Sequence, residues 1–246
     1  MKRLTYTAIL ILIVIFFYQC EKEEKENDFS GDSGTFIDQR DGLKYEWIRI
    51  GDQIWMEENL KSTIYADGTP LVDGTGGGNI YDEHSAKYYF WYDDDEKYAE
   101  TYGALYTWSA AMNGAKADTS KSDPIQGICP DGWHLPSESE WEQLKNYLGG
   151  YDQAGKKMKE AGTDHWEAPN TGATNESGFS ALPAGSRNYE GRYNGLGTDA
   201  YFWSSTISEE STHAVMKMLD NQDGDLGEDA LIITYGCSVR CIKDEK

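Results

Sequence analysis

A turn that leads directly into a capped helix, ICPDGWHLPSESEWEQL over residues 128–144, constrains the fold more strongly than any other stretch of the chain. Ser137 and Glu140 have the S-x-x-E spacing of a capping box, in which both side chains satisfy free backbone N–H groups at the start of a helix. Three apolar residues follow at helical spacing, namely Trp141, Leu144 and Leu148. Because Gly149-Gly150 then provides a stop signal, the pattern predicts a helix between Ser137 and Gly149 with one buried face.

The residues before this helix indicate architecture rather than chemistry. Residues 130–132 (PDG) have the composition of a turn. Trp133 and Leu135 are candidate core residues. His134 and Glu138 have no role in this interpretation, and we expect both side chains to be exposed.

Alternating apolar and polar residues predict strands on both sides of this helix. The expected strands cover residues 43–51, 53–60, 201–207, 213–219, 230–236 and 237–242. Residues 29–42 precede them as a linker or an edge segment. Short helices are expected over residues 105–112 and 154–161. Helices between an N-terminal strand pair and a C-terminal set of strands indicate one α+β domain.

The first twenty residues have the pattern of a signal sequence. Lys2 and Arg3 precede an apolar run over residues 4–18, which is shorter than the roughly 18 residues of a membrane-spanning helix and typical of a signal peptide. Cys20 follows and resembles the lipidated cysteine of bacterial lipoproteins, with Gln19 where a small residue is usual. We therefore expect residues 1–19 to be a signal peptide and Cys20 to carry an outer-membrane lipid anchor.

Residues 20–35 are expected to form a flexible tether. Residues 21–28 (EKEEKEND) are charged and contain no apolar side chain, so they cannot bury a core of their own. The stretch Lys22-Glu23-Glu24 resembles the export signal of surface-exposed lipoproteins in the Bacteroidetes. The folded domain is then expected over residues 36–246, exposed at the cell surface, with the periplasmic side as the alternative.

The charge balance excludes one class of partner. The chain has 22 Lys and Arg against 43 Asp and Glu, a formal net charge of −21. A surface of this sign repels the phosphate backbone, so a nucleic-acid partner is not expected.

Three cysteines remain once Cys20 is assigned to the lipid. Cys237 and Cys241 lie in one predicted strand, where four residues span about 13 Å. A disulfide tolerates about 7 Å between Cα atoms, so these two should not pair with each other. Cys129 is therefore free to pair with either of them, and the remaining thiol is expected to be buried and inert.

No motif nominates a metal site, a cofactor or a catalytic residue. The four histidines are far apart in sequence, and no C-x-x-C pair or G-x-S-x-G elbow is present. Residues 220–229 (DNQDGDLGED) are rich in oxygen ligands suited to calcium, but they lie between two predicted strands. We interpret them as a solvated hairpin loop.

One aromatic cluster has the composition of a binding site. The candidate residues are Tyr88, Tyr89, Trp91 and Tyr92, followed directly by Asp93 and Asp94. Aromatic faces beside carboxylates suit a sugar, which stacks on the rings and donates hydrogen bonds to the acids. The alternative is that these rings fill the core.

Seven segments in order, between residues 50 and 244, resemble the Fibrobacter succinogenes major paralogous domain, and the match covers roughly residues 36–244. They include IGDQIWMEENLKS, YGALYTWSAAMN, GICPDGWHLPSESEW, APNTGATNESGFSALPAGSR and YFWSST. The resemblance implies a C-type lectin-like fold, with two helices packed on a twisted antiparallel sheet and long loops. It also implies a disulfide between Cys129 and Cys241, while Cys237 stands where the family usually has an aromatic residue.

The resemblance supplies no reaction, so we expect a non-enzymatic surface lipoprotein that binds an extracellular glycan or protein. Two alternatives remain. One is a cryptic enzyme related to the formylglycine-generating branch of the same fold. The other is a structural or adhesin subunit of a surface assembly.

Overall fold

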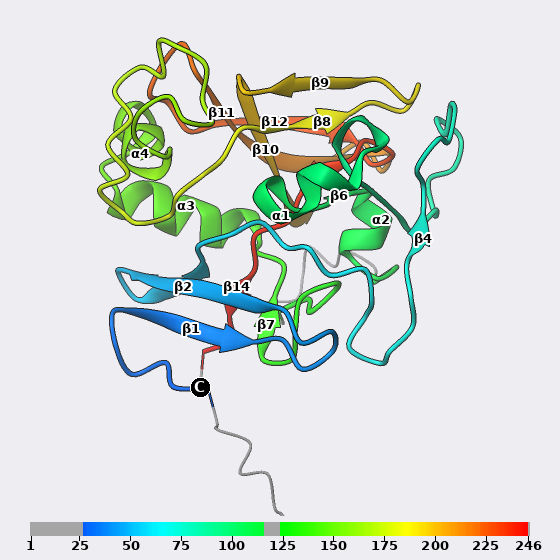
Figure 1. Ribbon diagram of the computed structural model, residues 1–246, viewed down its shortest axis with the longest axis horizontal. Helices are drawn as coiled ribbons and strands as arrows, with labels where there is room; N and C mark the ends of the chain where they lie inside the picture. Colours follow the sequence, from blue (N-terminus) through cyan, green and yellow to red (C-terminus); the bar gives the residue numbers. More distant parts are fainter. Residues whose placement is uncertain (1–26, 116–123, 246) are drawn as a thin grey trace, which may run out of the picture.

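Two sheets and a set of short helices make up the fold (Figure 1). The computed structural model describes residues 27–115 and 124–245. The first sheet has five strands, in the order β1 (Ser33–Ile37), β2 (Lys44–Ile50), β3 (Gln53–Met56), β14 (Ile242–Lys243) and β7 (Trp133–His134). All of its pairs are antiparallel.

The second sheet has nine strands and is mixed. Its main path runs β12 (Gly227–Ile232), β11 (His213–Asp220), β10 (Asp199–Ile207), β13 (Cys237–Ser238), β6 (Leu105–Tyr106), β5 (Tyr88–Phe90) and β4 (Val72–Asp73). Off this path, β8 (Ala184–Arg187) pairs with β10 and with β9 (Tyr193–Leu196). The contacts of β10 with β13 and β8, and of β4 with β5, are parallel. The α+β class is therefore confirmed, but the expectation of a single antiparallel sheet was wrong.

The longest strands are those whose alternation was clearest in the sequence. β10 and β11 pair antiparallel with Tyr201 opposite Met218 and Trp203 opposite Met216, close to the bounds expected. β12 lies a few residues earlier than expected, because residues 233–236 turn back toward β13 rather than extend the hairpin.

The last segment of the chain joins the two sheets. A single strand was expected over residues 237–242, yet β13 belongs to the nine-stranded sheet and β14 to the five-stranded one. The three residues between them, Val239, Arg240 and Cys241, are fully buried. Cys241 forms the expected disulfide with Cys129, across a sequence separation of 112 residues. Cys237 is a free, buried thiol.

The capped helix is present as predicted. In α3 (Glu138–Tyr147), the Ser137 hydroxyl accepts from the Glu140 N–H at 3.3 Å and the Glu140 carboxylate accepts from the Ser137 N–H at 2.7 Å. Trp141 and Leu144 are buried, and the Trp141 ring lies 4.7 Å from that of Trp55 in β3. This face holds the helix on the core between the two sheets.

The bounds of the other helices differ from those expected. α4 (Tyr151–Met158) begins directly after Gly150 and ends before residue 161. The helix expected over residues 105–112 is divided into β6 and α2 (Trp108–Ala111), because Thr107 is extended and caps α2 by accepting from the Ala110 N–H.

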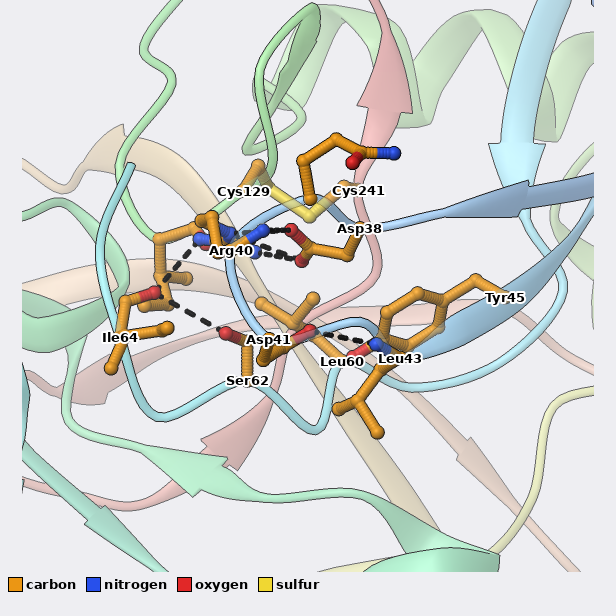
Figure 2. A network of polar contacts seen from close by, with 12 residues as sticks. Asp38, Arg40, Asp41, Leu43, Tyr45, Leu60, Ser62, Ile64, Cys129 and Cys241 are labelled. Carbon is orange, nitrogen blue, oxygen red and sulfur yellow. Dashed lines mark hydrogen bonds and ion pairs between the residues drawn. A yellow bond between two sulfur atoms is a disulfide. The ribbon is translucent and has the colours of Figure 1, made fainter. Parts of the chain in front are cut away.

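A buried ion pair fixes the turn between β1 and β2 (Figure 2). Arg40 donates to both oxygens of Asp38, with Nε–Oδ1 and Nη2–Oδ2 distances of 2.9 and 2.6 Å. Its Nη1 also donates to the carbonyl oxygens of Ile64 and Ile128 at 2.9 and 2.6 Å. Because Ile128 precedes Cys129, the network ties the first hairpin to the disulfide.

Folded structure begins upstream of residue 36. β1 starts at Ser33, and the Phe29 ring packs 5.2 Å from Trp47 and 5.6 Å from Trp133. The first described residues lie beside the C-terminus, at the end of the molecule that carries β1 and β7 (Figure 1). The expected signal peptide and Cys20 lie outside the described residues. Within the described ranges, no helix is long and apolar enough to cross a membrane.

Candidate functional site

Strand alternation divides the six candidate binding residues between two faces. On β5, Tyr88 and the buried Phe90 face a small cluster with Ile80 and Leu105. Tyr89 and Trp91 face the opposite way, toward the main core, with their ring centroids 5.3 Å apart. The six residues therefore do not form one site. Only Tyr88, Tyr92, Asp93 and Asp94 remain candidates for a binding surface.

Tyr92, Asp93 and Asp94 form the short turn η1 (Tyr92–Asp94). Asp93 and Asp94 have φ of 56° and 55°, a left-handed conformation that aspartate tolerates better than most residues. The Asp94 carboxylate accepts a hydrogen bond from the Tyr193 hydroxyl at 2.5 Å. Burial, together with this carboxylate, raises the pKa of Tyr193 well above its ordinary value.

Further tyrosines, which the sequence did not indicate, surround this strand. They lie in loops, in β9 and in the helical turns that follow Tyr92, and are Tyr81, Tyr98, Tyr102, Tyr189, Tyr193 and Tyr235. Most are single tyrosines in separate segments, which carry no periodic signal, so the tertiary fold brings them together. Two arrangements result, a cleft and a row of rings.

The Tyr81–Tyr189 cleft has a volume of about 590 Å³ and is lined by Asn79, Tyr81, Asp82, Glu83 and Tyr189. The two rings meet edge to face, with centroids 5.0 Å apart. Tyr81 remains 47% exposed. The cleft therefore combines aromatic surface with an amide and two carboxylates.

A buried arginine positions the wall of this cleft. Arg187 at the end of β8 is 1% exposed and lies over the Phe90 ring at 4.2 Å. Its Nη2 donates to the carbonyl of Gly77 at 2.6 Å, and the Ile80 N–H donates to the Tyr189 carbonyl at 2.8 Å. At Gly74 an added Cβ would meet the Phe90 ring at 2.1 Å. The glycine-rich loop is thus held against Phe90 at Gly74 and against Arg187 at Gly77, just before Tyr81.

The row of rings, here called the ring ladder, runs Tyr193, Tyr92, Tyr98, Tyr102 and His165. Successive ring centroids are 5.2, 5.7, 6.1 and 5.9 Å apart. The rings come from β9, η1, η2 (Glu96–Tyr98), α1 (Ala99–Tyr102) and the loop after α4. All five side chains are partly exposed.

An acidic pocket of about 180 Å³ lies beyond His165. It is lined by Glu46, Glu57, Glu58 and Glu160. The Glu160 carboxylate lies 2.8 Å from Nδ1 of His165. Burial and the charge of Glu46 raise the pKa of Glu57.

Fully buried Arg240 forms part of the pocket wall. Its guanidinium donates to Asn59 Oδ1 and to the carbonyls of Met56 and Phe179. Burial lowers the pKa of Arg240 to about 9, and the charges of Glu58 and Glu57 act in the opposite direction.

The acidic stretch at residues 220–229 includes the expected loop between β11 and β12. Lys159 holds this loop through hydrogen bonds to its backbone. Lys159 is fully buried, and its ammonium donates to the carbonyls of Thr171, Asp220 and Asp223 at 3.2, 2.8 and 2.6 Å. The same ammonium lies 5.4 Å from the Trp166 ring centroid. The carbonyls that converge in this loop therefore already contact an internal cation.

The expectation that His134 is exposed was wrong. It is 4% exposed, with Nε2 2.7 Å from Glu140 and Nδ1 2.7 Å from Asp244. Burial alone would lower the pKa of His134, but the two carboxylates outweigh it and raise the pKa. Glu138 is half-buried, and its N–H donates to Thr206.

The described residues contain no group of three or more His, Cys, Asp or Glu side chains arranged to hold a metal ion. One hydroxyl–histidine contact occurs on an exposed turn, where Thr212 and Glu210 both contact Nδ1 of His213, at 3.1 and 3.2 Å. Because both partners share one nitrogen, this arrangement does not relay a proton from hydroxyl to carboxylate. Burial also raises the pKa of the Cys237 thiol, which disfavours the reactive thiolate.

Comparisons with known proteins place most of the chain in one family. Neither a search of curated proteins nor a search of solved structures gives a match. The family model of the Fibrobacter succinogenes major domain matches residues 48–243. These residues include most strands of both sheets, the capped helix, the disulfide, the Tyr81–Tyr189 cleft and the ring ladder. The chain therefore belongs to the Fibrobacter succinogenes major domain family.

Proposed function

We propose that this protein is a non-enzymatic binding module, held at the outer membrane through a lipid on Cys20, and that the Tyr81–Tyr189 cleft binds a glycan. The observation that carries the proposal is the composition of the cleft. Two tyrosine rings lie beside Asn79, Asp82 and Glu83 in one concave site. Rings stack on the apolar faces of a sugar, while amide and carboxylate oxygens accept from its hydroxyls.

The finer fold assignment belongs to the same proposal. A C-type lectin-like arrangement is supported by the long loops that present the site, the terminal segment that joins both sheets, and the Cys129–Cys241 disulfide. A lectin-like domain commonly places its ligand on such loops, because loops vary freely on a rigid scaffold.

The position of the cleft supports a surface role. Tyr189 lies in the turn between β8 and β9, which is far from the end of the molecule where the described chain begins (Figure 1). A tether between Cys20 and Phe29, shorter than the one expected from the sequence, would leave this face free to point away from the membrane.

A glycan array, probed with the full chain in neutral detergent micelles, tests the proposal. We expect binding to a defined set of glycans, and at least a tenfold weaker affinity for Tyr81→Ala and Tyr189→Ala. Tyr147→Ala is the matched control, because Tyr147 is 66% exposed on α3. The absence of glycan binding, or equal losses in the control, would overturn the proposal.

A further inference from the structure

The ring ladder and the acidic pocket form one continuous surface. The Tyr102 ring contacts His165 at 5.9 Å, and His165 contacts Glu160, which lines the pocket. The four successive interplanar angles, from Tyr193 to His165, are 56°, 82°, 55° and 86°. Neighbouring rings are therefore tilted or edge-on to one another rather than stacked face to face.

Carboxylates lie at both ends of the ladder. Asp94 accepts from the Tyr193 hydroxyl at one end, and Glu160 contacts His165 at the other. The nearby lysines already have anionic partners: Lys97 pairs with Asp95, and Lys61 pairs with Glu58 and Glu100. The surface therefore offers aromatic rings and negative charge together.

Lys97 shows how this surface holds a cation. Its ammonium lies 4.6 Å from the centroid of the Tyr98 ring and 2.6 Å from the Asp95 carboxylate. A ring face and a carboxylate thus act on one ammonium at the same time. Each such cation–π contact is weak at an exposed site, and several in a row add up along an extended ligand.

The acidic pocket provides a deeper position at the end of the ladder. Its cavity of about 180 Å³ is lined by four glutamates, with Arg240 as the only basic residue of the lining. Glu57 is partly buried, so its negative charge is poorly solvated. A cationic head group inserted here would gain from a carboxylate that has lost part of its water.

We propose that the ring ladder and the acidic pocket form a docking surface for an extended basic peptide segment. Lysine or arginine side chains would lie on the rings of Tyr98 and Tyr102, and one such side chain would pair with Glu160 and enter the pocket. Charge complementarity carries the choice of partner, since the chain has a net charge of −21 and the ladder has acids at both ends. The surface is separate from the Tyr81–Tyr189 cleft and does not depend on the proposed glycan.

Fluorescence anisotropy with a labelled decalysine peptide and the full chain in neutral detergent micelles tests this inference. Double substitution of Tyr98 and Tyr102 by Ala keeps the net charge, and we expect it to weaken binding at least tenfold. Tyr151→Ala is the matched control, because Tyr151 is 52% exposed and lies beside Asp225 but outside the ladder. Its affinity should remain that of the unchanged chain.

A second pair of variants distinguishes decalysine binding at the ladder and the pocket from its general attraction to an acidic protein. Glu160→Gln should weaken decalysine binding at least threefold, whereas Glu209→Gln, at an exposed position far from the ladder in sequence, should have no such effect. Equal losses in each variant and its control would overturn the inference. So would failure of decalysine to bind, or binding of a neutral oligosaccharide lost on substitution of Tyr98 and Tyr102.

The two proposals fail independently. Loss of glycan binding in Tyr81→Ala with unchanged decalysine binding would support a separate peptide surface. Loss of decalysine binding in Tyr81→Ala, with none in the Tyr98 and Tyr102 variant, would move the cation site to the cleft and overturn the inference.

Discussion

His134 bridges the start of α3 and the end of the chain through two carboxylates. Its ring can contact Glu140 and Asp244 at 2.7 Å each only with a hydrogen on both nitrogens, because carboxylates are acceptors. The positive ring and its two anions therefore act as a clamp between residues 110 positions apart. The same Glu140 also completes the capping box.

This clamp predicts a pH window for stability. The pKa of His134 is raised above its ordinary 6.5, so its contribution is full below that value and is lost as pH rises through the folded-state pKa. The pKa of Glu140 is lowered below its ordinary 4.5, because its bonds to His134 and Ser137 outweigh burial. Its contribution is therefore lost as pH falls through its folded-state value. The clamp should therefore contribute most to the free energy of unfolding between pH 4.5 and 6.5.

Urea unfolding of the unchanged chain and His134→Asn across pH measures the effect. We expect a difference in the free energy of unfolding of about 1–3 kcal/mol inside the window, which shrinks above and below it. His84→Asn is the control, since His84 is partly exposed and its ring contacts Tyr81. A difference for His134→Asn that stays constant with pH would contradict the clamp.

At the scale of elements, Lys159 joins α4 to two loops. It follows the last residue of the helix, and its three carbonyl partners come from the segment after residue 170 and from the β11–β12 loop. Three N⁺–H···O=C bonds of this kind supply the hydrogen-bond partners that a fully buried lysine needs.

Replacement of Lys159 by Met should lower the free energy of unfolding by about 1–3 kcal/mol, because three backbone carbonyls lose their charged donor. Lys157→Met is the control on the same helix. Lys157 is partly exposed and its ammonium is 3.6 Å from Glu176, so we expect a change below about 1 kcal/mol. Thermal unfolding of both variants makes the comparison, and equal losses would contradict a special role for Lys159.

Local patterns in the sequence predicted the elements that depend on local chemistry. The capping box of Ser137 and Glu140 located α3, and alternation located β10 and β11. These features were predictable because a cap or a half-buried strand is encoded within a few residues.

The failures share a different physical cause. His134 was misplaced because its second partner, Asp244, follows 110 residues later. Residues 237–242 were read as one strand because alternation does not reveal which sheet each half joins. The tyrosines of the cleft and the ladder come from several separate segments, so sequence proximity indicated Tyr89 and Trp91 instead, which face the core.

At the scale of the whole molecule, the predicted lipid anchor on Cys20 determines whether the protein is attached to the membrane. Cys20→Ser should move the protein from the membrane fraction to the soluble fraction, because acyl chains on the cysteine supply the membrane affinity. Gln19→Ala is the companion variant and should stay in the membrane, since a small residue there suits lipoprotein processing. Membrane fractionation after a high-salt wash measures both. Retention of Cys20→Ser in the membrane would show that another segment anchors the chain.

The described chain enters the domain through Phe29 and then β1, an edge strand whose described sheet contacts are with β2. If the proposed lipid on Cys20 fixes the chain in the membrane, a ligand bound at the cleft would place the domain under tension, and that load would first reach the contacts of Phe29 and the hydrogen bonds of β1. Behind β1, the Cys129–Cys241 disulfide closes 112 residues of chain covalently. Under pulling, the domain should therefore yield first at its first strand, while the sheets joined by the terminal segment keep the binding face intact.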